Sequence, residues 1–193
     1  MKRSTHEILT THVGALAHPQ DLHDMIQAKE QGKPVDLEAL DMAVRRAVTD
    51  IVKKQAENGV TVVNDGEESK PNYTSYVMNR LNGFGGDQMP NTPRSHEVKD
   101  FPEYFASHPT GIGLRRLACI GPLSWKDFSS VDKDIENLKM ATKGVKVEDV
   151  FMTTASPGQI CSRFPTTHYP THEAYLQAMA GVMKQVNRQH PAP

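Results

Sequence analysis

The sequence is poor in cysteine and aromatic residues, and it has no excess of either charge. Its 193 residues include two Cys, and Phe, Trp and Tyr together make up 6% of the chain. Cys119 and Cys161 follow no pairing or metal-ligand spacing, so we expect reduced thiols rather than a disulfide framework or a zinc knuckle. The 22 Lys and Arg residues balance 23 Asp and Glu residues, for a formal net charge of −1. Such a chain has no basic field that would attract a nucleic acid.

The sequence also lacks a long apolar run. No stretch approaches the roughly 18 apolar residues of a membrane span, and residues 1–7 have no apolar segment of the kind that a secretory signal needs. We therefore expect a cytoplasmic protein with neither a membrane nor a nucleic acid among its partners. Hydrophobic residues make up 37% of the chain and the mean hydropathy is −0.54, which indicates a globular chain with a modest core. The length predicts a single domain over residues 1–193.

Short apolar runs alternate with stretches of helical periodicity along the chain. The runs predict strands over residues 8–13, 60–64, 116–121 and 150–154. Apolar spacings of three and four predict a long helix between the N-cap Asp36 and Asn58–Gly59, and further helices over 131–142 and after Thr171. Short helical turns are expected within 73–81 and 101–107, and residues 83–113 are expected to form a long loop excursion. Strands that alternate with helices predict an α/β fold with a parallel sheet.

Polar residues follow the ends of these predicted strands, where ligands collect in parallel sheets. Asp65, Glu67 and Glu68 follow the second strand. They would hold an ammonium group or supply a base, or they would form an acidic turn with a helix cap. His12, in the first strand, is either a hydrogen-bonded core histidine or a catalytic one.

Three further residues lie near the third predicted strand. Arg115 and Arg116 would clamp a carboxylate or a polyanion through their forked donors, or they are a surface pair. Trp125 would stack on a planar ring of a ligand, or it packs under a loop. The sequence alone leaves both alternatives open.

Four segments carry a resemblance to a known family. Ile8–Gly14, Val60–Glu67, Cys119–Asp127 and Val150–Gly158 resemble, in this order, motifs of the cobalamin-independent methionine synthase family, and of its short single-barrel members in particular. Members of this family are (β/α)8 TIM barrels that use zinc to activate a thiol such as homocysteine and transfer to it a methyl group from a folate. A sister group of the same fold joins a coenzyme thiol to an epoxide. The resemblance implies an incomplete barrel here, the N-terminal half with about four parallel strands.

The resemblance also assigns roles to particular residues. It implies that Val13, Gly14 and Ala15 lie along the thiol substrate, that Glu67 receives its ammonium group, and that Arg115 or Arg116 touches the folate side. The family's zinc ligands come from strands after the fourth, and this sequence has no counterpart of them. We therefore expect zinc as the family's cofactor, but no metal ligand and no catalytic residue within this chain.

Two functions follow as expectations. The resemblance implies a zinc-dependent 5-methyltetrahydropteroyltriglutamate–homocysteine S-methyltransferase of methionine biosynthesis. The alternative is a non-catalytic half barrel that binds its ligand weakly. In either case half a barrel exposes two sheet edges, so a homodimer or a partner chain is expected to cover them.

Overall fold

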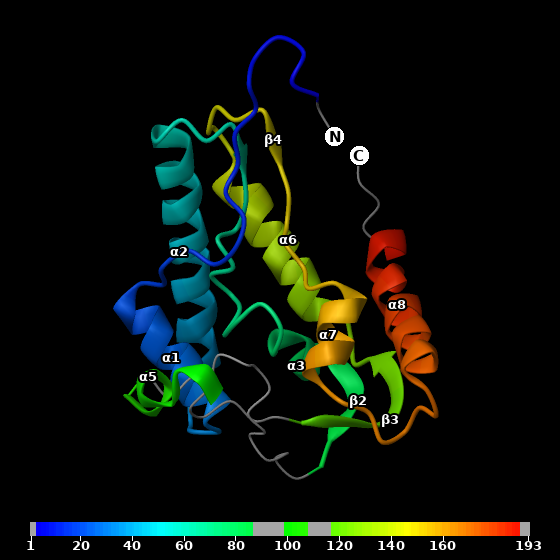
Figure 1. Ribbon diagram of the computed structural model, residues 1–193. Helices are drawn as coiled ribbons and strands as arrows, with labels where there is room; N and C mark the ends of the chain where they lie inside the picture. The colour runs from blue at the N-terminus through cyan, green and yellow to red at the C-terminus, as the bar shows by residue number, and fades with distance from the viewer. Residues whose placement is uncertain (1–2, 87–98, 108–116, 190–193) are drawn as a thin grey trace.

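A small parallel sheet lies in the upper part of the molecule as drawn, beside the helices α2 (Leu37–Glu57) and α6 (Ser129–Ala141) (Figure 1). The computed structural model describes residues 3–86, 99–107 and 117–189. Strand β1 (Val62–Val63) pairs in parallel with β4 (Asp149–Val150). On the other side of β1, Thr11 forms an isolated parallel bridge with Val62. All three segments run in the same direction, toward α3 and α7 in Figure 1, so their carboxyl ends meet at one edge of the sheet.

Helix α2 (Leu37–Glu57) is the longest helix and covers this sheet. The Asp36 side chain caps it by accepting hydrogen bonds from the backbone N–H groups of Glu38 and Ala39. Its buried face packs with α1 (Gln20–Glu30), with α6 (Ser129–Ala141) and with β1. The cluster of buried residues formed in this way includes Leu22, Ile26, Leu40, Val44, Val48, Val52, Val63 and Leu138. Burying side chains of this kind stabilises the fold by about 1.5–3 kcal/mol each.

A second layer is built on an antiparallel pair. Strand β2 (Leu81–Gly85) pairs with β3 (Ala118–Trp125), with Leu81 opposite Trp125 and Phe84 opposite Cys119. The pairing is irregular between Asn82 and Phe84, where Gly83 adopts a φ of 96°. A Cβ at Gly83 would lie 2.8 Å from the carbonyl oxygen of Pro122, so only glycine fits there.

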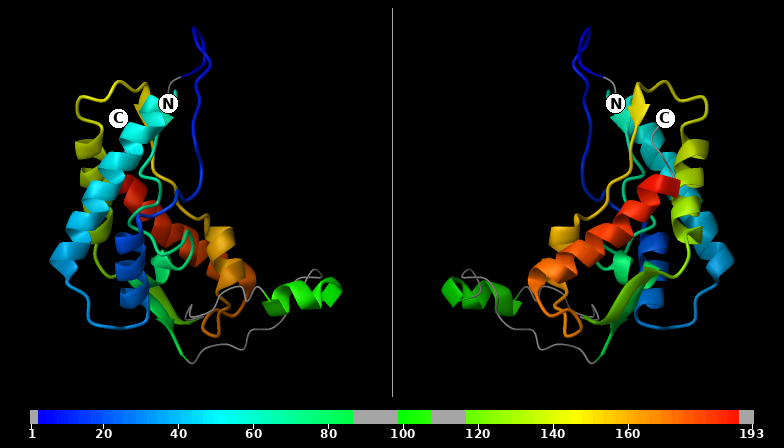
Figure 2. Two further views of the ribbon diagram at one scale, coloured as in Figure 1. Left: turned by 90° about the vertical axis from the view of Figure 1, so that its left-hand side faces the viewer. Right: turned by 90° about the vertical axis from the view of Figure 1, so that its right-hand side faces the viewer.

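Three helices complete this second layer. They are α3 (Tyr76–Arg80), α7 (Pro157–Arg163) and α8 (His172–Gln189). Ser156 and Thr171 cap α7 and α8, each by accepting a backbone N–H three residues ahead. The buried cluster of this layer includes Tyr76, Leu81, Cys119, Ile160, Phe164, Tyr175 and Met179. The short helix α5 (Pro102–Ser107) has no buried residue and projects away from both layers (Figure 2).

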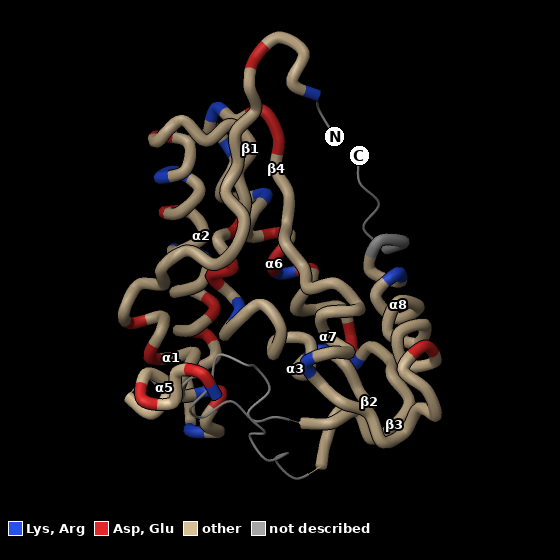
Figure 3. Tube along the Cα trace, viewed as in Figure 1, with Lys and Arg blue, Asp and Glu red and all other residues tan. Residues whose placement is uncertain are grey.

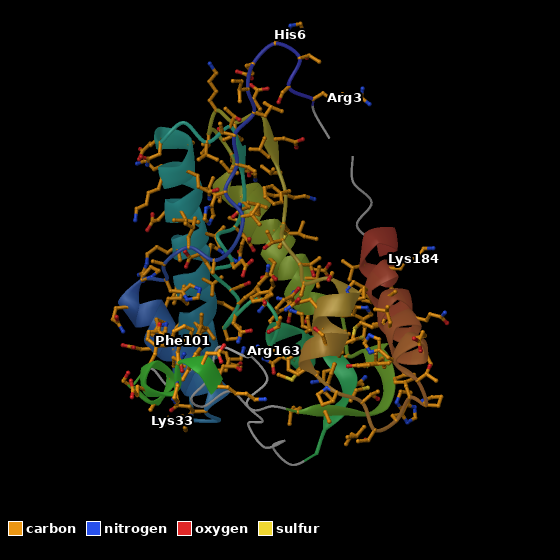
Figure 4. All side chains as sticks on the ribbon, viewed as in Figure 1. Arg3, His6, Lys33, Phe101, Arg163 and Lys184 are labelled. Atoms are coloured by element: carbon orange, nitrogen blue, oxygen red, sulfur yellow. The ribbon has the colours of Figure 1, made fainter. Side chains whose placement is uncertain are left out.

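Charged residues of both signs are distributed along the helices rather than gathered in one segment (Figure 3). The N-terminal segment, marked by Arg3 and His6, rises above the rest of the molecule (Figure 4). Within the described ranges, no helix combines the length and the apolarity needed to cross a membrane.

The α/β class is confirmed, but the expected set of four parallel strands is not what the described residues form. The third predicted strand, β3, is antiparallel to β2, and it continues through Gly121–Pro122 instead of ending there. The parallel sheet has only two named strands and the bridge at Thr11. β3 is not hydrogen-bonded to β1 or β4, because its partners are β2 and, through an isolated bridge at Cys119, Thr166.

Other elements agree with the sequence or differ from it locally. The helices after Asp36 and Thr171 and over 131–142 are confirmed as α2, α8 and α6. Residues 83–85, expected in the loop excursion, lie in β2, and α1 and α7 were not expected. Residues 87–98 and 108–116, the greater part of that excursion, lie outside the described residues.

Candidate functional site

A buried polar turn, residues 64–70, follows β1 and organises the site. Gln55 of α2 holds Asn64 at both backbone groups: its Nε2 donates to the Asn64 carbonyl (2.8 Å) and its Oε1 accepts from the Asn64 N–H (3.2 Å). The Asn64 side chain accepts a hydrogen bond from the backbone N–H of Gly66 (2.8 Å). These bonds satisfy polar groups that burial has removed from water, so the turn has a defined shape.

Two successive residues of this turn adopt left-handed backbone conformations. Gly66 has a φ of 63° and Glu67 a φ of 60°, and Glu67 is the only described non-glycine residue with a positive φ. This conformation costs a non-glycine residue roughly 1–2 kcal/mol. The Glu67 N–H donates to the Asp65 carboxylate (3.2 Å), and the Gly66 carbonyl accepts from the Leu16 N–H (2.9 Å). The second bond joins the turn to the segment that follows the bridge at Thr11.

A cavity of about 520 Å³ opens beside this turn. Its walls are residues 13–18, His23, Glu67, residues 70–73, Tyr76 and residues 153–155. These residues follow the carboxyl ends of the three parallel segments, where chemistry collects in α/β folds. The structure thus brings Val13, Gly14, Ala15 and Glu67, all predicted from the sequence, to one cavity. Their role in substrate binding stays a prediction.

The Glu67 carboxylate is the most unusual group in this cavity. Glu67 is only 4% exposed. Its Oε1 accepts a hydrogen bond from the Thr153 hydroxyl (2.7 Å), and its Oε2 has no hydrogen-bond partner within the described part of the chain. Burying a carboxylate oxygen without a hydrogen-bond donor costs free energy. This oxygen is therefore suited to accept a hydrogen bond from a ligand.

Lys70 lines the same cavity, although no sequence pattern singles it out. It is 3% exposed, and its Nζ donates to the carbonyl oxygen of Thr153 (2.7 Å). The ammonium also lies 5.2 Å from the centre of the Tyr76 ring. The only available signal was its position just after a strand end, which it shares with many surface lysines.

Two further carboxyl groups, close to Glu67 in the chain, have raised pKa values. Burial and the charge of Asp65 raise the pKa of Glu68 to about 7, and Lys54 opposes this rise. Burial also raises the pKa of Asp65, although the nearby charge of Lys70 lowers it in part. The Glu68 Oε2 lies 3.9 Å from Nε2 of His18, which lines the cavity.

The remaining sequence candidates lie elsewhere. Trp125 donates from Nε1 to the carbonyl of Val182 (2.8 Å) and stacks on Phe128, so it packs in the second layer and does not line this cavity. Arg115 and Arg116 lie outside the described residues. The His12 backbone carbonyl accepts a hydrogen bond from the side-chain amide of Asn64, so His12 supports the turn.

The described residues do not fit a metal ion. They include no group of three or more His, Cys, Asp or Glu side chains that could hold one. Cys119 and Cys161 are free and buried, and burial raises the pKa of both thiols, which disfavours the thiolate that a metal needs. The zinc implied by the resemblance therefore has no ligand set within residues 3–86, 99–107 and 117–189.

Two solved structures have the same fold. A B12-independent methionine synthase from Shewanella sp. W3-18-1, in complex with selenomethionine, superposes with a TM-score of 0.63 at 16% identity, over 93% of this chain and 47% of that one. A protein described as a vitamin-B12-independent methionine synthase from Listeria monocytogenes superposes with a TM-score of 0.63 at 18% identity, over 94% of this chain and 49% of that one. No protein-family model and no curated protein matches the sequence. The chain therefore has a methionine-synthase-like fold and spans about half the length of these two proteins.

Proposed function

We propose that the cavity beside the 64–70 turn binds the amino-acid part of a thiol substrate, with the Glu67 carboxylate accepting the substrate ammonium. The proposal rests mainly on one observation, the buried Glu67 Oε2 that lacks a hydrogen-bond donor in a cavity walled by Val13, Gly14 and Ala15. An ammonium group supplies a charge-assisted hydrogen bond to such an oxygen. Gly14 has a φ of 105° and no side chain, so a ligand can approach the backbone closely at that wall.

The shared fold supports an amino acid as the ligand. The Shewanella methionine synthase was solved with selenomethionine, which carries the same ammonium and carboxylate groups as homocysteine. In this proposal the chain corresponds to the N-terminal half of a TIM barrel, and the reaction it serves is methyl transfer from a folate to homocysteine in methionine biosynthesis. The described residues bind and orient the amino acid, and we assign no transfer step to them because they contain no fitting metal site.

In this proposal Thr153 orients the Glu67 carboxylate toward the ligand. Thr153 donates to Glu67 Oε1 and so holds the carboxylate with Oε2 free. A bound ammonium then satisfies Oε2, and the side chain of the amino acid extends along Val13, Gly14 and Ala15. The buried turn excludes water from this contact, which strengthens the charge interaction relative to one at the surface.

Calorimetry with L-homocysteine and L-methionine tests the proposal. We expect binding to the unaltered protein, and Glu67→Gln should weaken it by about 10- to 100-fold, because a hydrogen bond to a charged group contributes roughly 1.5–3 kcal/mol. Glu136→Gln, at an exposed position of α6, is the matched control and should bind normally. Equal affinity of Glu67→Gln and the unaltered protein would refute the role of Glu67.

A further inference from the structure

Lys70 is a buried cation that the function proposed above does not use. It lines the amino-acid cavity and is 3% exposed. Among the described residues, no carboxylate oxygen forms an ion pair with its Nζ, although the charge of Asp65 acts on it through space. A buried charge without a partner is costly, so an anionic group of a ligand would be stabilised beside it.

The protein satisfies only part of the hydrogen-bonding capacity of this ammonium. Of its three N–H donors, one is used by the Thr153 carbonyl at 2.7 Å. The Thr153 hydroxyl lies at 3.5 Å, a long contact, and the Tyr76 ring offers its face at 5.2 Å. Capacity therefore remains for an acceptor from the cavity.

Thr153 joins the two charges of the cavity. Its hydroxyl donates to Glu67 Oε1, and its carbonyl accepts from Lys70 Nζ. A negative and a positive group are thus held on either side of one residue, at the same cavity wall. An α-amino acid presents the complementary pair, because its ammonium and carboxylate groups are separated by one carbon.

We propose that Lys70 binds the carboxylate of the ligand, so that the cavity selects α-amino acids as zwitterions over amines and amides of the same side chain. This inference rests on the proposed function, because Glu67 takes the ammonium in both. Lys70 is then a specificity-determining residue of the site. Recognition of the carboxylate by a cation, rather than by neutral backbone donors alone, gives the site a charge preference that can be measured.

The test compares three ligands on the unaltered protein and on Lys70→Met by calorimetry. The ligands are L-methionine, L-methioninamide and 3-(methylthio)propylamine, which share a side chain and an amino group but differ at the carboxylate. We expect the unaltered protein to bind L-methionine at least 10-fold more tightly than the other two. Lys70→Met should lose this preference and should bind the amide and the amine as the unaltered protein does.

Controls separate a binding role from a structural one. Lys139→Met, at an exposed position of α6, should keep the full preference, and Lys70→Arg should keep part of it. If Lys70→Met fails to fold, Lys70→Gln replaces it, and a folded variant that keeps the full preference overturns the role of Lys70. Equal binding of the three ligands overturns the role of Lys70 and leaves that of Glu67 standing, whereas binding of none of them overturns both.

Discussion

At the scale of single residues, the site consists of opposite charges buried within one turn. Glu67 could be predicted because a carboxylate after a strand end coincides with a family motif. Lys70 could not, because its hydrogen-bond partner Thr153 is 83 positions away in the sequence. The Thr153 carbonyl accepts from Lys70, and its hydroxyl donates to Glu67. A side chain whose environment comes from a distant segment leaves no local pattern.

The acidity of Glu68 leads to a prediction about stability. The pKa of Glu68 is raised to about 7 in the folded protein from an ordinary value of 4.5. Between these two pKa values the folded state holds a proton that the unfolded state has lost. The free energy of unfolding therefore falls as the pH rises through this range, and the stabilisation that the bound proton gives at acidic pH is lost above about 7. Glu68→Gln removes the penalty of ionisation and should stabilise the protein at pH 8, relative to pH 5, by roughly 1–3 kcal/mol.

Thermal unfolding of both proteins at pH 5 and pH 8 measures this effect. The difference in melting temperature between Glu68→Gln and the unaltered protein should grow by several degrees toward pH 8. Glu136→Gln should show no such change, because its carboxyl group is exposed in the folded state. A difference that is the same at both pH values would contradict the buried, proton-binding state of Glu68.

At the scale of elements, the sequence predicts helices more reliably than the sheet. Helix α2 has a capping Asp36, a regular apolar face and a glycine stop at Gly59, all of which are local signals. The pairing of β3 is not local, since its partner β2 is separated from it by 32 residues, and the two glycines of β2 give it the composition of a loop. The weakly amphipathic α1 and the seven-residue α7 gave too little pattern to be recognised.

Gly83 tests the antiparallel pair of β2 and β3. Gly83→Ala places a Cβ 2.8 Å from the Pro122 carbonyl oxygen at a φ of 96°, so we expect a loss of stability of roughly 1–3 kcal/mol. Gly158→Ala is the control, because a Cβ there meets nothing within 4 Å and its φ is negative or extended. Chemical denaturation should show a lower midpoint for the first variant only, and equal midpoints would argue against this strand register.

At the scale of the whole molecule, the fold is that of about half of a methionine synthase. The described parallel sheet ends at residues 10–12 on one side and at β4 on the other, and both outer edges lack a strand partner among the described residues. Val150 of β4 is 40% exposed, and Val13, which follows the bridge segment and lines the cavity, is 69% exposed. Unpaired edges with exposed apolar side chains favour association with another chain. We therefore still predict that a second copy or a partner chain covers these edges.

The cavity beside the 64–70 turn combines all three scales, because the sheet places it, the turn shapes it and two buried charges give it chemistry. A crystal structure of the protein grown with L-methionine is the most direct test. The account predicts the amino acid in the cavity, with its nitrogen about 3 Å from Glu67 Oε2 and its carboxylate at a similar distance from Lys70 Nζ. A ligand bound elsewhere, or one whose nitrogen points away from Glu67, would contradict it.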